Sequence, residues 1–591
     1  METPRLIRKI LLFGSLLLII TWIMYQMDTR AEKNAKGQDF EQRLVEESME
    51  FLPQNRGQEK FVPISIPDPK NHSEYFWLNC AHPNMVTYLY EKAQRGRLST
   101  QPKMLVAFIV HSREGFQAML PLIREMEHST KSKYLPILVV TMGVISDEEL
   151  QSAVTPEDKK FSCRIFQIQH SGVEILQAVA SATKAMVFFG TKGVDGSEHL
   201  QASLKELKRK YKIPFVMIPP AEFEYVTWLA HVMPVAFQNW EVPQIVISII
   251  TANRPESLER LLVSLTQAYY IGDQVNLILN TESFSDPETL KLVANFEWPH
   301  GIKTVKHRIR PGGLIPAVME SWYPKDLDEY GILLEDDIEV SKFFYIWCRY
   351  NLMTYRYGYS HNWEGGLFGF SLYTPRKNEL NKKAAGTKWD SNEYFLEKTG
   401  EAHTPYMHAL PCSWGALYFP KIWMEFHLFV TKRIEVQRKV EIEGSSSNGW
   451  SDSWKKFFFE MVHLNDYYMI YPNFNNQSSF STNHMGAGIH IKNDGGDQNH
   501  RPEDFTVPLL EDFSMMLSQL PEGKLPNLRD LPALTLLGEF QKASYYFKKV
   551  HQNSSIYQTT KLYEAYLKCL EKKKKKGTAC VKDIRKFYIN K

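Results

Sequence analysis

The sequence has few cysteines and almost no surplus of either charge. Six cysteines in 591 residues are too few for a disulfide-dense scaffold, although they leave room for one or two bridges. No Cys-x-x-Cys pair and no zinc-type spacing of Cys and His occurs, so a structural zinc site is not expected. Lys and Arg number 70 and Asp and Glu number 67, which leaves a net charge of +3. This balance gives no electrostatic basis for nucleic acid as the main partner.

Long hydrophobic runs are also scarce, and one segment alone is apolar enough to cross a bilayer. Residues 10–27 carry no charge and follow Arg5, Arg8 and Lys9. Their length lies just above the lower limit of about 17 residues for a membrane-spanning helix. The positive flank predicts a cytoplasmic tail at 1–9 and the remaining chain across the membrane. A cleaved signal peptide is the alternative, but the run is longer than a usual h-region and no small-x-small site follows closely.

Beyond this predicted anchor the chain divides into four parts. Residues 28–101 are polar and contain several prolines, which indicates a stem. Residues 102–222 alternate five short apolar runs with amphipathic stretches, which predicts a parallel, doubly wound, Rossmann-like sheet. This part has no G-x-G-x-x-G and no P-loop, so a structural or acceptor-recognition role is expected. A second α/β unit is expected over 243–506 and a helical region over 507–591, and the fold class is therefore a membrane-anchored α/β protein.

Three adjacent carboxylates directly follow a buried apolar strand of the second unit. They belong to Glu335, Asp336 and Asp337. The carboxyl ends of parallel strands are where open α/β sheets bind ligands. Neighbouring carboxylates repel each other, and a divalent cation shared with substrate phosphates relieves the repulsion. The motif therefore predicts a site for Mn²⁺ or Mg²⁺, with a solvated acidic turn as the alternative.

The order of motifs around these carboxylates resembles the nucleotide-sugar domain of GT-A glycosyltransferases. A strand, an Asn-Arg-Pro turn, a helix, a strand with a polar end and the segment LLEDDIEVSKFF follow one another. The sequence is most similar to family-2-type enzymes and to the N-acetylglucosaminyltransferase I family, whose metal motif is also EDD. The resemblance covers 243–490 and is specific around 331–344. It implies that Asp337 ligates the metal, that Asp336 faces the ribose and that Glu335 faces the donor sugar.

The same resemblance implies further donor contacts. Glu282 falls where the family has a base-reading acid at the end of its second strand. Thr251, Asn253 and Arg254 fall in the turn where the first strand meets the nucleotide, although the family often has Asp where this chain has Asn253. The segment Pro311-Gly312-Gly313 would let the backbone approach the donor at Gly312 and Gly313, with an ordinary turn as the alternative.

A transferase also needs a base for the acceptor hydroxyl, and the late part of the chain offers candidates. Asp452 lies at the start of a predicted helix in NGWSDSWKKFFFEM, where related enzymes carry W-D-D-W with an Asp proposed as base. A helix cap is the alternative for Asp452, and Glu460 and Asp466 are lesser candidates. GT-A enzymes frequently complete the metal or phosphate site with a late His, for which His484 and His490 are candidates beside a structural role.

These features together predict a single-pass type II membrane glycosyltransferase of the Golgi or endoplasmic reticulum. It would move one sugar, with inversion, from a nucleotide-diphosphate donor to a hydroxyl of a glycan, glycoprotein or glycolipid. A UDP-linked donor is expected, although the residues themselves do not choose between uridine and guanosine. Three Asn-x-Ser triplets, at Asn71, Asn476 and Asn553, are compatible with a lumenal body. A nucleotidyltransferase and a membrane-tethered carbohydrate- or nucleotide-binding protein on a degenerate transferase fold remain alternatives.

Overall fold

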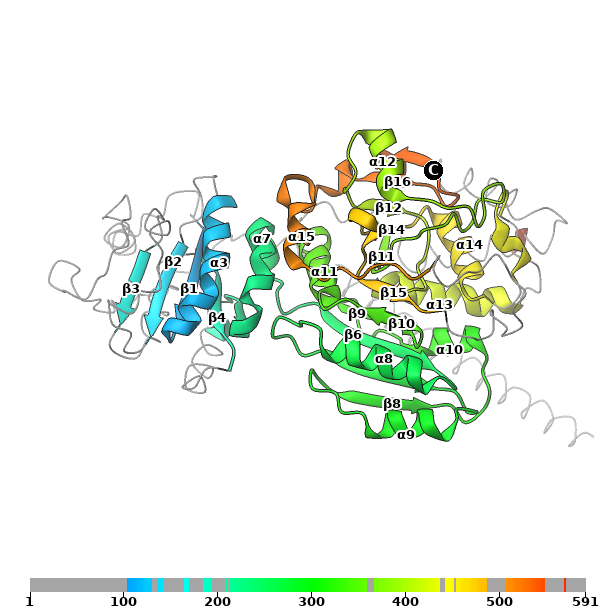
Figure 1. Cartoon of the computed structure of the whole chain (residues 1–591), viewed down its shortest axis with the longest axis horizontal. Helices are drawn as coiled ribbons and strands as arrows, with labels where there is room; N and C mark the ends of the chain where they lie inside the picture. The colour runs from blue at the N-terminus through cyan, green and yellow to red at the C-terminus, as the bar shows by residue number, and fades with distance from the viewer. Residues whose placement is uncertain are drawn as a thin grey trace, which may run out of the picture. The chain divides into compact units, whose positions relative to one another are not determined.

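The computed structural model describes most of the chain between residues 104 and 547 (Figure 1). The described residues are 104–129, 137–142, 164–168, 184–193, 208–210, 212–358, 366–435, 442–450, 453–485, 505–547 and 568–569. The predicted tail, anchor and stem, together with Asp452 and His490, lie outside these ranges. Within them, no helix is both long enough and apolar enough to span a membrane. All of them belong to one unit, residues 67–591.

The first sheet consists of five parallel strands, which the five apolar runs form as predicted. Their order is β3 (Arg164–Ile168), β2 (Ile137–Met142), β1 (Met104–Val110), β4 (Lys184–Thr191) and β5 (Phe215–Ile218). All four pairings are parallel. Helix α3 (Arg113–Ser129) follows β1 and buries Phe116, Met119, Leu120 and Ile123, the stripe that their spacing indicates. The prediction of a parallel sheet in this region is confirmed.

The second sheet has ten strands of mixed direction. Their order is β17 (Phe540–Lys542), β16 (Pro532–Leu534), β12 (Tyr406–His408), β14 (Tyr468–Tyr471), β11 (Leu367–Ser371), β13 (Ala416–Tyr418), β9 (Glu329–Glu335), β6 (Gln244–Thr251), β7 (Asn276–Thr281) and β8 (Lys303–His307). The last four of these strands run parallel to one another, whereas β13 is antiparallel to β9. Strands β7 and β8 follow β6 on one side and β9 lies on the other, so the order of the strands reverses at β6.

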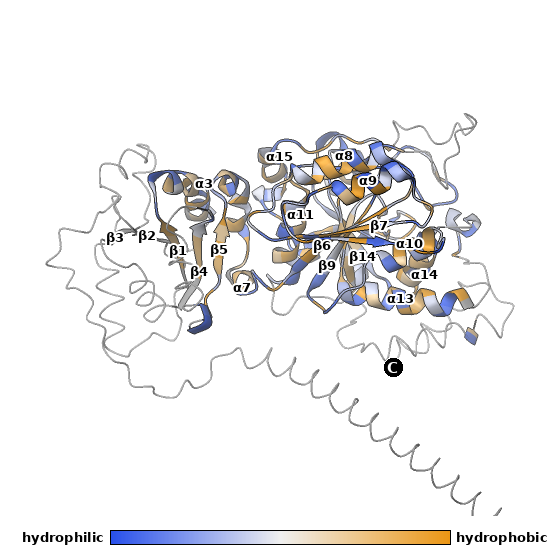
Figure 2. Cartoon of the chain, turned by 90° about the horizontal axis from the view of Figure 1, so that it is seen from below, coloured by the Kyte–Doolittle hydropathy of each residue, from blue (hydrophilic) through white to orange (hydrophobic). Residues whose placement is uncertain are grey.

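Helices cover both faces of the parallel part of this sheet. Figure 2 shows α8 (Pro255–Thr266) and α9 (Pro287–Asn295) on one side, and α10 (Leu314–Ser321), α13 (Pro420–Glu435) and α14 (Lys455–Asn465) on the other. Helix α8 buries Leu258, Leu261, Leu262 and Leu265, which recur at helical spacing. The central strands β6 and β9 are covered on both faces and are apolar along most of their length, as the sequence QIVISIIT of β6 illustrates, whereas the edge strand β8 is polar and exposed.

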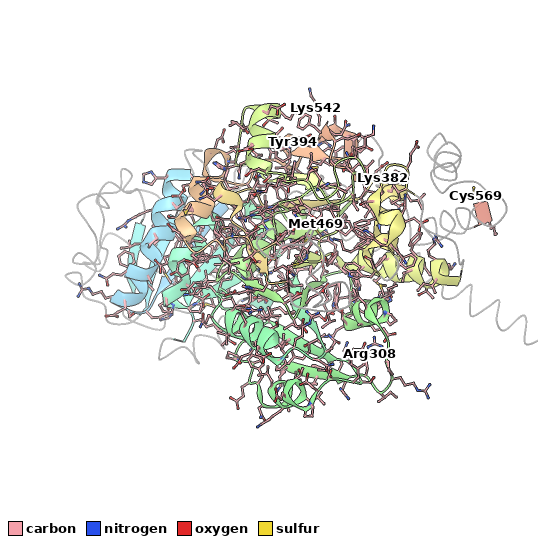
Figure 3. The ribbon with its side chains drawn as sticks, turned by 45° about the vertical axis from the view of Figure 1, so that its right-hand side comes forward. Arg308, Lys382, Tyr394, Met469, Lys542 and Cys569 are labelled. Atoms are coloured by element: carbon pink, nitrogen blue, oxygen red, sulfur yellow. The ribbon has the colours of Figure 1, made fainter. Side chains whose placement is uncertain are left out.

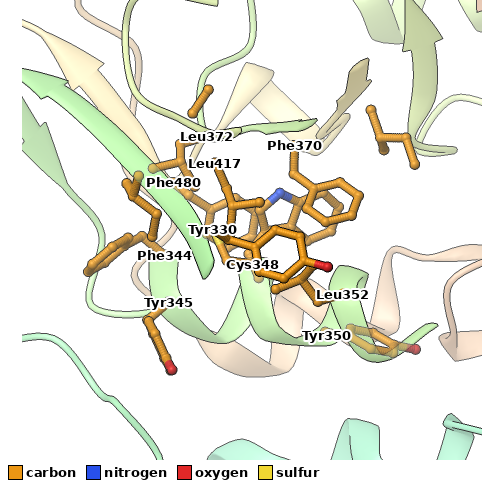
Figure 4. Close-up of a cluster of buried hydrophobic side chains, with 14 of the residues drawn as sticks. Tyr330, Phe344, Tyr345, Cys348, Tyr350, Leu352, Phe370, Leu372, Leu417 and Phe480 are labelled. Carbon is orange, nitrogen blue, oxygen red and sulfur yellow. The ribbon is translucent and has the colours of Figure 1, made fainter. Parts of the chain in front are cut away.

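An aromatic core anchors the segment that carries the acidic motif. Helix α11 (Phe344–Asn351) follows β9 and the short strand β10 (Ile338–Val340), and all its residues are buried. Trp347 stacks on Phe480 with ring centroids 4.9 Å apart and donates a hydrogen bond to the Ser371 carbonyl at 3.1 Å. Figure 4 shows the surrounding cluster, which includes Tyr330, Phe344, Tyr345, Cys348, Tyr350, Leu352, Phe370, Leu372, Leu417 and Phe480. Residues on either side of the acidic motif are therefore fixed by core packing.

The prediction of a helical region after residue 507 is wrong for residues 507–547. The structure has only short helices there, α15 (Phe513–Ser518) and α16 (Ser544–Phe547), with two brief 3-10 turns. Strands β16 and β17 extend the ten-stranded sheet beyond β12. Three prolines between residues 521 and 532 interrupt any long helix, and the buried run Leu531–Leu534 is long enough only for a strand.

Candidate functional site

Strands β6, β7 and β9 end at one edge of the second sheet, and the predicted site residues follow their ends. In the register of the sheet, Ile250 pairs with Glu335 and Thr251 pairs with Thr281, the residue before Glu282. The turn after β6, Glu282 and the Glu335–Asp337 motif therefore lie beside one another. We call these residues the carboxyl edge. The strand order reverses here between β6 and β9, and such switch points are where open α/β sheets form ligand crevices.

Asp336 is held by the turn that follows β6. Its Oδ2 accepts a hydrogen bond from the Thr251 hydroxyl at 2.8 Å, and its Oδ1 accepts one from Nη1 of Arg254 at 2.9 Å. Burial raises the pKa of the Asp336 carboxyl, whereas Arg254 and the Thr251 hydroxyl oppose that rise. Both partners were predicted site residues, and the structure brings them to the carboxylate itself.

Asp337 is hydrogen-bonded to a residue from the later part of the chain. Its Oδ1 accepts a hydrogen bond from Nδ2 of Asn483 at 3.0 Å, and its Oδ2 lies 3.3 Å from Nη1 of Arg254. Asn483 ends β15 (Ser481–Asn483), which pairs antiparallel with β10 directly after the acidic motif. Sequence reasoning did not identify Asn483. Its place next to the candidate His484 was the one available signal.

The surroundings of Glu335 disfavour the ionised form of its carboxyl group. Burial, followed by the charges of Asp337 and Asp336, raises its pKa to about 8, against the opposing effects of Arg254 and Lys455. Lys455 is itself in an ion pair with Glu379. Ionisation of Glu335 beside Asp336 and Asp337 is therefore unfavourable, and an added cation would favour its carboxylate form.

The donor set of the acidic motif fits a divalent cation that is shared with a substrate. Carboxylate oxygens are ligands that Mg²⁺ and Mn²⁺ prefer. Across the described ranges, no group of three or more His, Cys, Asp and Glu side chains is arranged to hold a metal ion. A metal completed by substrate phosphates needs only one or two carboxylates from the protein, so the motif suffices for that arrangement.

The imidazole of His484 is engaged with a different carboxylate. Its Nε2 lies 2.6 Å from Oε2 of Glu339, and only its backbone N–H reaches Asp337, donating to the carbonyl oxygen at 2.9 Å. The imidazole therefore contacts β10 next to the end of β15. Metal ligation by His484 stays a prediction, as does that by His490.

Glu282 lies after β7 and faces the loop between β8 and α10. Its Oε1 is 3.6 Å from Nε of Arg308, a residue labelled in Figure 3, and its Oε2 accepts the Gly312 N–H at 3.4 Å. A Cβ on Gly312 would lie 2.6 Å from Nη1 of Arg308. Gly313 has a φ of 72°, which glycine adopts most readily. The backbone of the turn therefore favours glycine at Gly313, whereas a side chain at Gly312 would have to displace the end of Arg308. The contact of both glycines with a donor stays a prediction.

Asn253 points to a neighbouring loop instead of the acidic motif. Its Oδ1 accepts the backbone N–H of Asp286 at 2.8 Å. Asp286 in turn caps α9 by accepting the Thr289 N–H at 2.7 Å. Asn253 thus joins the turns after β6 and β7, and its direct contact with a nucleotide stays a prediction.

A small pocket adjoins Glu335. Trp454 lines it, and this residue follows the candidate base Asp452 by two positions in the sequence. The other lining residues are Ser248, Ile250, Val318, Ser321, Leu333, Leu334, Cys412, Ser413 and Tyr418. The start of α14 and the acidic motif therefore line the same pocket.

The two lesser base candidates lie on or just after α14. Asp466 ends α14 in a left-handed conformation with a φ of 56°. Glu460 forms a buried ion pair with Arg433 of α13, with 2.9 Å between Oε2 and Nε and both side chains at most 3% exposed. This burial leaves Glu460 inaccessible to an acceptor, which argues against Glu460 as the base.

Comparison with protein families gives one partial match. The family model described as SPBC1E8.03c C-terminal domain matches residues 256–364, which is less than half of the chain. No curated protein matches the chain.

Several solved structures are similar to part of the chain. TarS 1–349 of S. aureus shares 11% identity over 40% of this chain and 59% of that chain, with a TM-score of 0.26. The mannosyltransferase PcManGT from Pyrobaculum calidifontis, in complex with GDP-Man and Mn²⁺, shares 12% identity over 50% of this chain and 66% of that chain, with a TM-score of 0.25. MnaA of S. aureus with UDP shares 10% identity over 39% of this chain and 74% of that chain, with a TM-score of 0.16.

This chain thus covers less than two thirds of the length of the first two structures. TM-scores this low do not establish a common fold. Any functional inference therefore rests on the residues of this chain alone.

Proposed function

We propose that the chain is a type II membrane glycosyltransferase that moves one sugar from a nucleoside-diphosphate donor to an acceptor hydroxyl. The observation that carries the proposal is the gathering of Thr251, Arg254, Glu282 and the Glu335–Asp337 motif where β6, β7 and β9 end. This is the point at which the strand order reverses, and open α/β sheets bind their ligands at such points.

The carboxyl edge offers a complementary group to each part of such a donor. Oε1 of Glu282 is buried and has no hydrogen-bond partner among the described residues, so it can accept an N–H from the base. Uracil and guanine both present such an N–H, and a UDP-linked donor is expected. Asp336 would accept hydrogen bonds from the ribose and Glu335 from the donor sugar, while Arg254 provides positive charge for the diphosphate.

The reaction also needs stabilisation of the leaving group and a base. Asp337 would hold Mn²⁺ or Mg²⁺, with His484 and His490 as further candidate ligands. A bound divalent cation neutralises charge that builds up on the departing diphosphate. The side chains of the protein contribute in two ways: Asn483 holds the Asp337 carboxylate in position, and Asp452 would accept the proton of the acceptor hydroxyl. In-line attack by an acceptor hydroxyl would invert the anomeric centre.

Donor binding tests the proposal without knowledge of the acceptor. We expect a panel of UDP- and GDP-sugars to contain members that raise the melting temperature of the full-length chain when Mn²⁺ is present. A ligand at about a hundred times its Kd adds about 2.7 kcal/mol to the free energy of unfolding. Excess chelator should abolish the shift. A panel in which no nucleotide sugar changes the melting temperature, with or without Mn²⁺, would contradict the proposal.

We further propose that residues 10–27 anchor the protein in the Golgi or endoplasmic reticulum membrane, with the body in the lumen beside glycan, glycoprotein or glycolipid acceptors. The support is the basic flank Arg5, Arg8 and Lys9 before an uncharged run. Protease added outside sealed microsomes should leave the body intact until detergent opens the vesicles. Digestion of the body in intact vesicles would place it in the cytosol.

A further inference from the structure

The acidic motif already contacts one cation of the chain, the guanidinium of Arg254. Its Nη1 lies 2.9 Å from Oδ1 of Asp336 and 3.3 Å from Oδ2 of Asp337. A single nitrogen therefore contacts both aspartates, and its one positive charge offsets only part of their combined negative charge. Any divalent cation held by Asp337 has to compete with this guanidinium for the same negative charge.

Arg254 is more exposed to solvent than the two aspartates that it contacts. Its side chain is 27% exposed, whereas those of Asp336 and Asp337 are 7% and 12% exposed. The described residues give its guanidinium no hydrogen bond other than those to the two aspartates. Rotation of a long, partly exposed side chain is therefore enough to release both carboxylates.

Each aspartate keeps a neutral partner when Arg254 is removed. Asp336 accepts the Thr251 hydroxyl at 2.8 Å, and Asp337 accepts the Asn483 amide at 3.0 Å. Both hydrogen bonds are buried and belong to strand ends. These partners can hold the two carboxylates in position after the guanidinium leaves.

We propose that Arg254 and the divalent cation exchange at the Asp336–Asp337 pair. In the metal-free protein Arg254 holds the two carboxylates together, and when the cation binds, the guanidinium leaves Asp337 and pairs with the diphosphate of the donor. Planar guanidinium groups bind phosphate through two parallel hydrogen bonds, and these replace the hydrogen bonds that Arg254 gives up at the carboxylates. This inference rests on the proposed metal and donor site and adds to it a competition between two cations.

The exchange has a thermodynamic consequence for the order of binding. Arg254 weakens metal binding in the absence of donor, because the metal must displace it. A bound diphosphate offers Arg254 a new partner and removes that penalty. Metal and nucleotide should therefore strengthen each other's binding reciprocally, and the reciprocity should depend on Arg254.

The test measures Mn²⁺ binding to the full-length chain without nucleotide. The electron paramagnetic resonance signal of free Mn²⁺ reports how much of the ion is bound. We expect Arg254→Met to bind Mn²⁺ about tenfold more tightly than wild type, because a charge-assisted competitor has been removed. Arg308→Met is the matched control. Arg308 is similarly exposed, at 22%, but pairs with Glu282 and Glu320. Its loss should leave Mn²⁺ affinity near that of wild type.

A second measurement adds UDP or GDP. Wild type should then gain Mn²⁺ affinity, and Arg254→Met should gain much less. Arg254→Gln serves as a second uncharged variant if Arg254→Met melts too early for the titration. Equal or weaker Mn²⁺ binding in the folded variants would overturn the exchange while leaving the metal site in place. Absence of Mn²⁺ binding in wild type and in every variant would overturn the exchange together with the metal dependence of the proposed function.

Discussion

Asp337→Asn is expected to lower metal-dependent sugar transfer by about a thousandfold or more, since the metal contributes several kcal/mol to transition-state stabilisation. The substitution keeps the shape of the side chain, and its carbonyl oxygen can still accept the Asn483 amide. It removes one negative charge and places an amide N–H₂ group opposite the guanidinium of Arg254. The measurement is release of nucleoside diphosphate from the donor that binds most tightly.

The control for Asp337→Asn is the same change at a helix cap. Asp512 caps α15 by accepting the Ser514 N–H at 2.9 Å, and Asn caps a helix about as well as Asp. Asp512→Asn should therefore transfer sugar at close to the wild-type rate. Full activity of Asp337→Asn, or equal turnover of wild type in excess chelator, would remove the metal from the mechanism.

The second large effect is expected at Asp452. Loss of a general base typically lowers the rate by about 10²–10⁴-fold. Helix α14 begins at Lys455 with Trp454 at its N-cap position, so Asp452 precedes the capping position. Asn keeps the shape of Asp but cannot take up the acceptor proton, so Asp452→Asn tests the role of the base. We expect unchanged melting and unchanged Mn²⁺-dependent donor binding, with transfer reduced to that extent. Wild-type transfer by Asp452→Asn would show that Asp452 is not the base.

Glu460 provides a contrast to Asp452 on the same stretch of chain. Because Glu460 is paired with the buried Arg433, Glu460→Gln should act on stability before it acts on chemistry. Breaking one partner of a buried ion pair costs about 3–5 kcal/mol. A fall in melting temperature together with an unchanged rate per folded molecule is the expected pattern. Loss of transfer without loss of stability would instead make Glu460 the base.

The convergence of the site could be predicted from local sequence because strand ends are local features. Thr251 and Glu335 each follow an apolar run directly, Glu282 follows one after two polar residues, and parallel pairing brings such strand ends to one edge. The pairing partners of the carboxylates could not be predicted in this way. Asn483 lies 146 positions from Asp337 and reaches it through the pairing of β10 with β15, each three residues long.

The error after residue 507 has a related cause. Strands β16 and β17 are three residues long, which is too short for an alternating pattern to be recognised. The buried strand β16 pairs with β12, a strand more than a hundred positions earlier in the chain, and β17 pairs with β16 in turn. Elements that depend on distant partners leave little trace in local periodicity. The long α8, by contrast, shows its apolar stripe in the sequence itself.

The central claim is that the carboxyl edge binds a metal and a diphosphate together. Its most direct test is the anomalous scattering of Mn²⁺ in crystals of the protein soaked with Mn²⁺ and UDP or GDP. We predict a Mn²⁺ peak between the Asp337 carboxylate and the diphosphate, with Arg254 moved from Asp337 to the phosphates. A diphosphate bound at another place, or a carboxyl edge without Mn²⁺ at which Arg254 still contacts both aspartates, would contradict the claim.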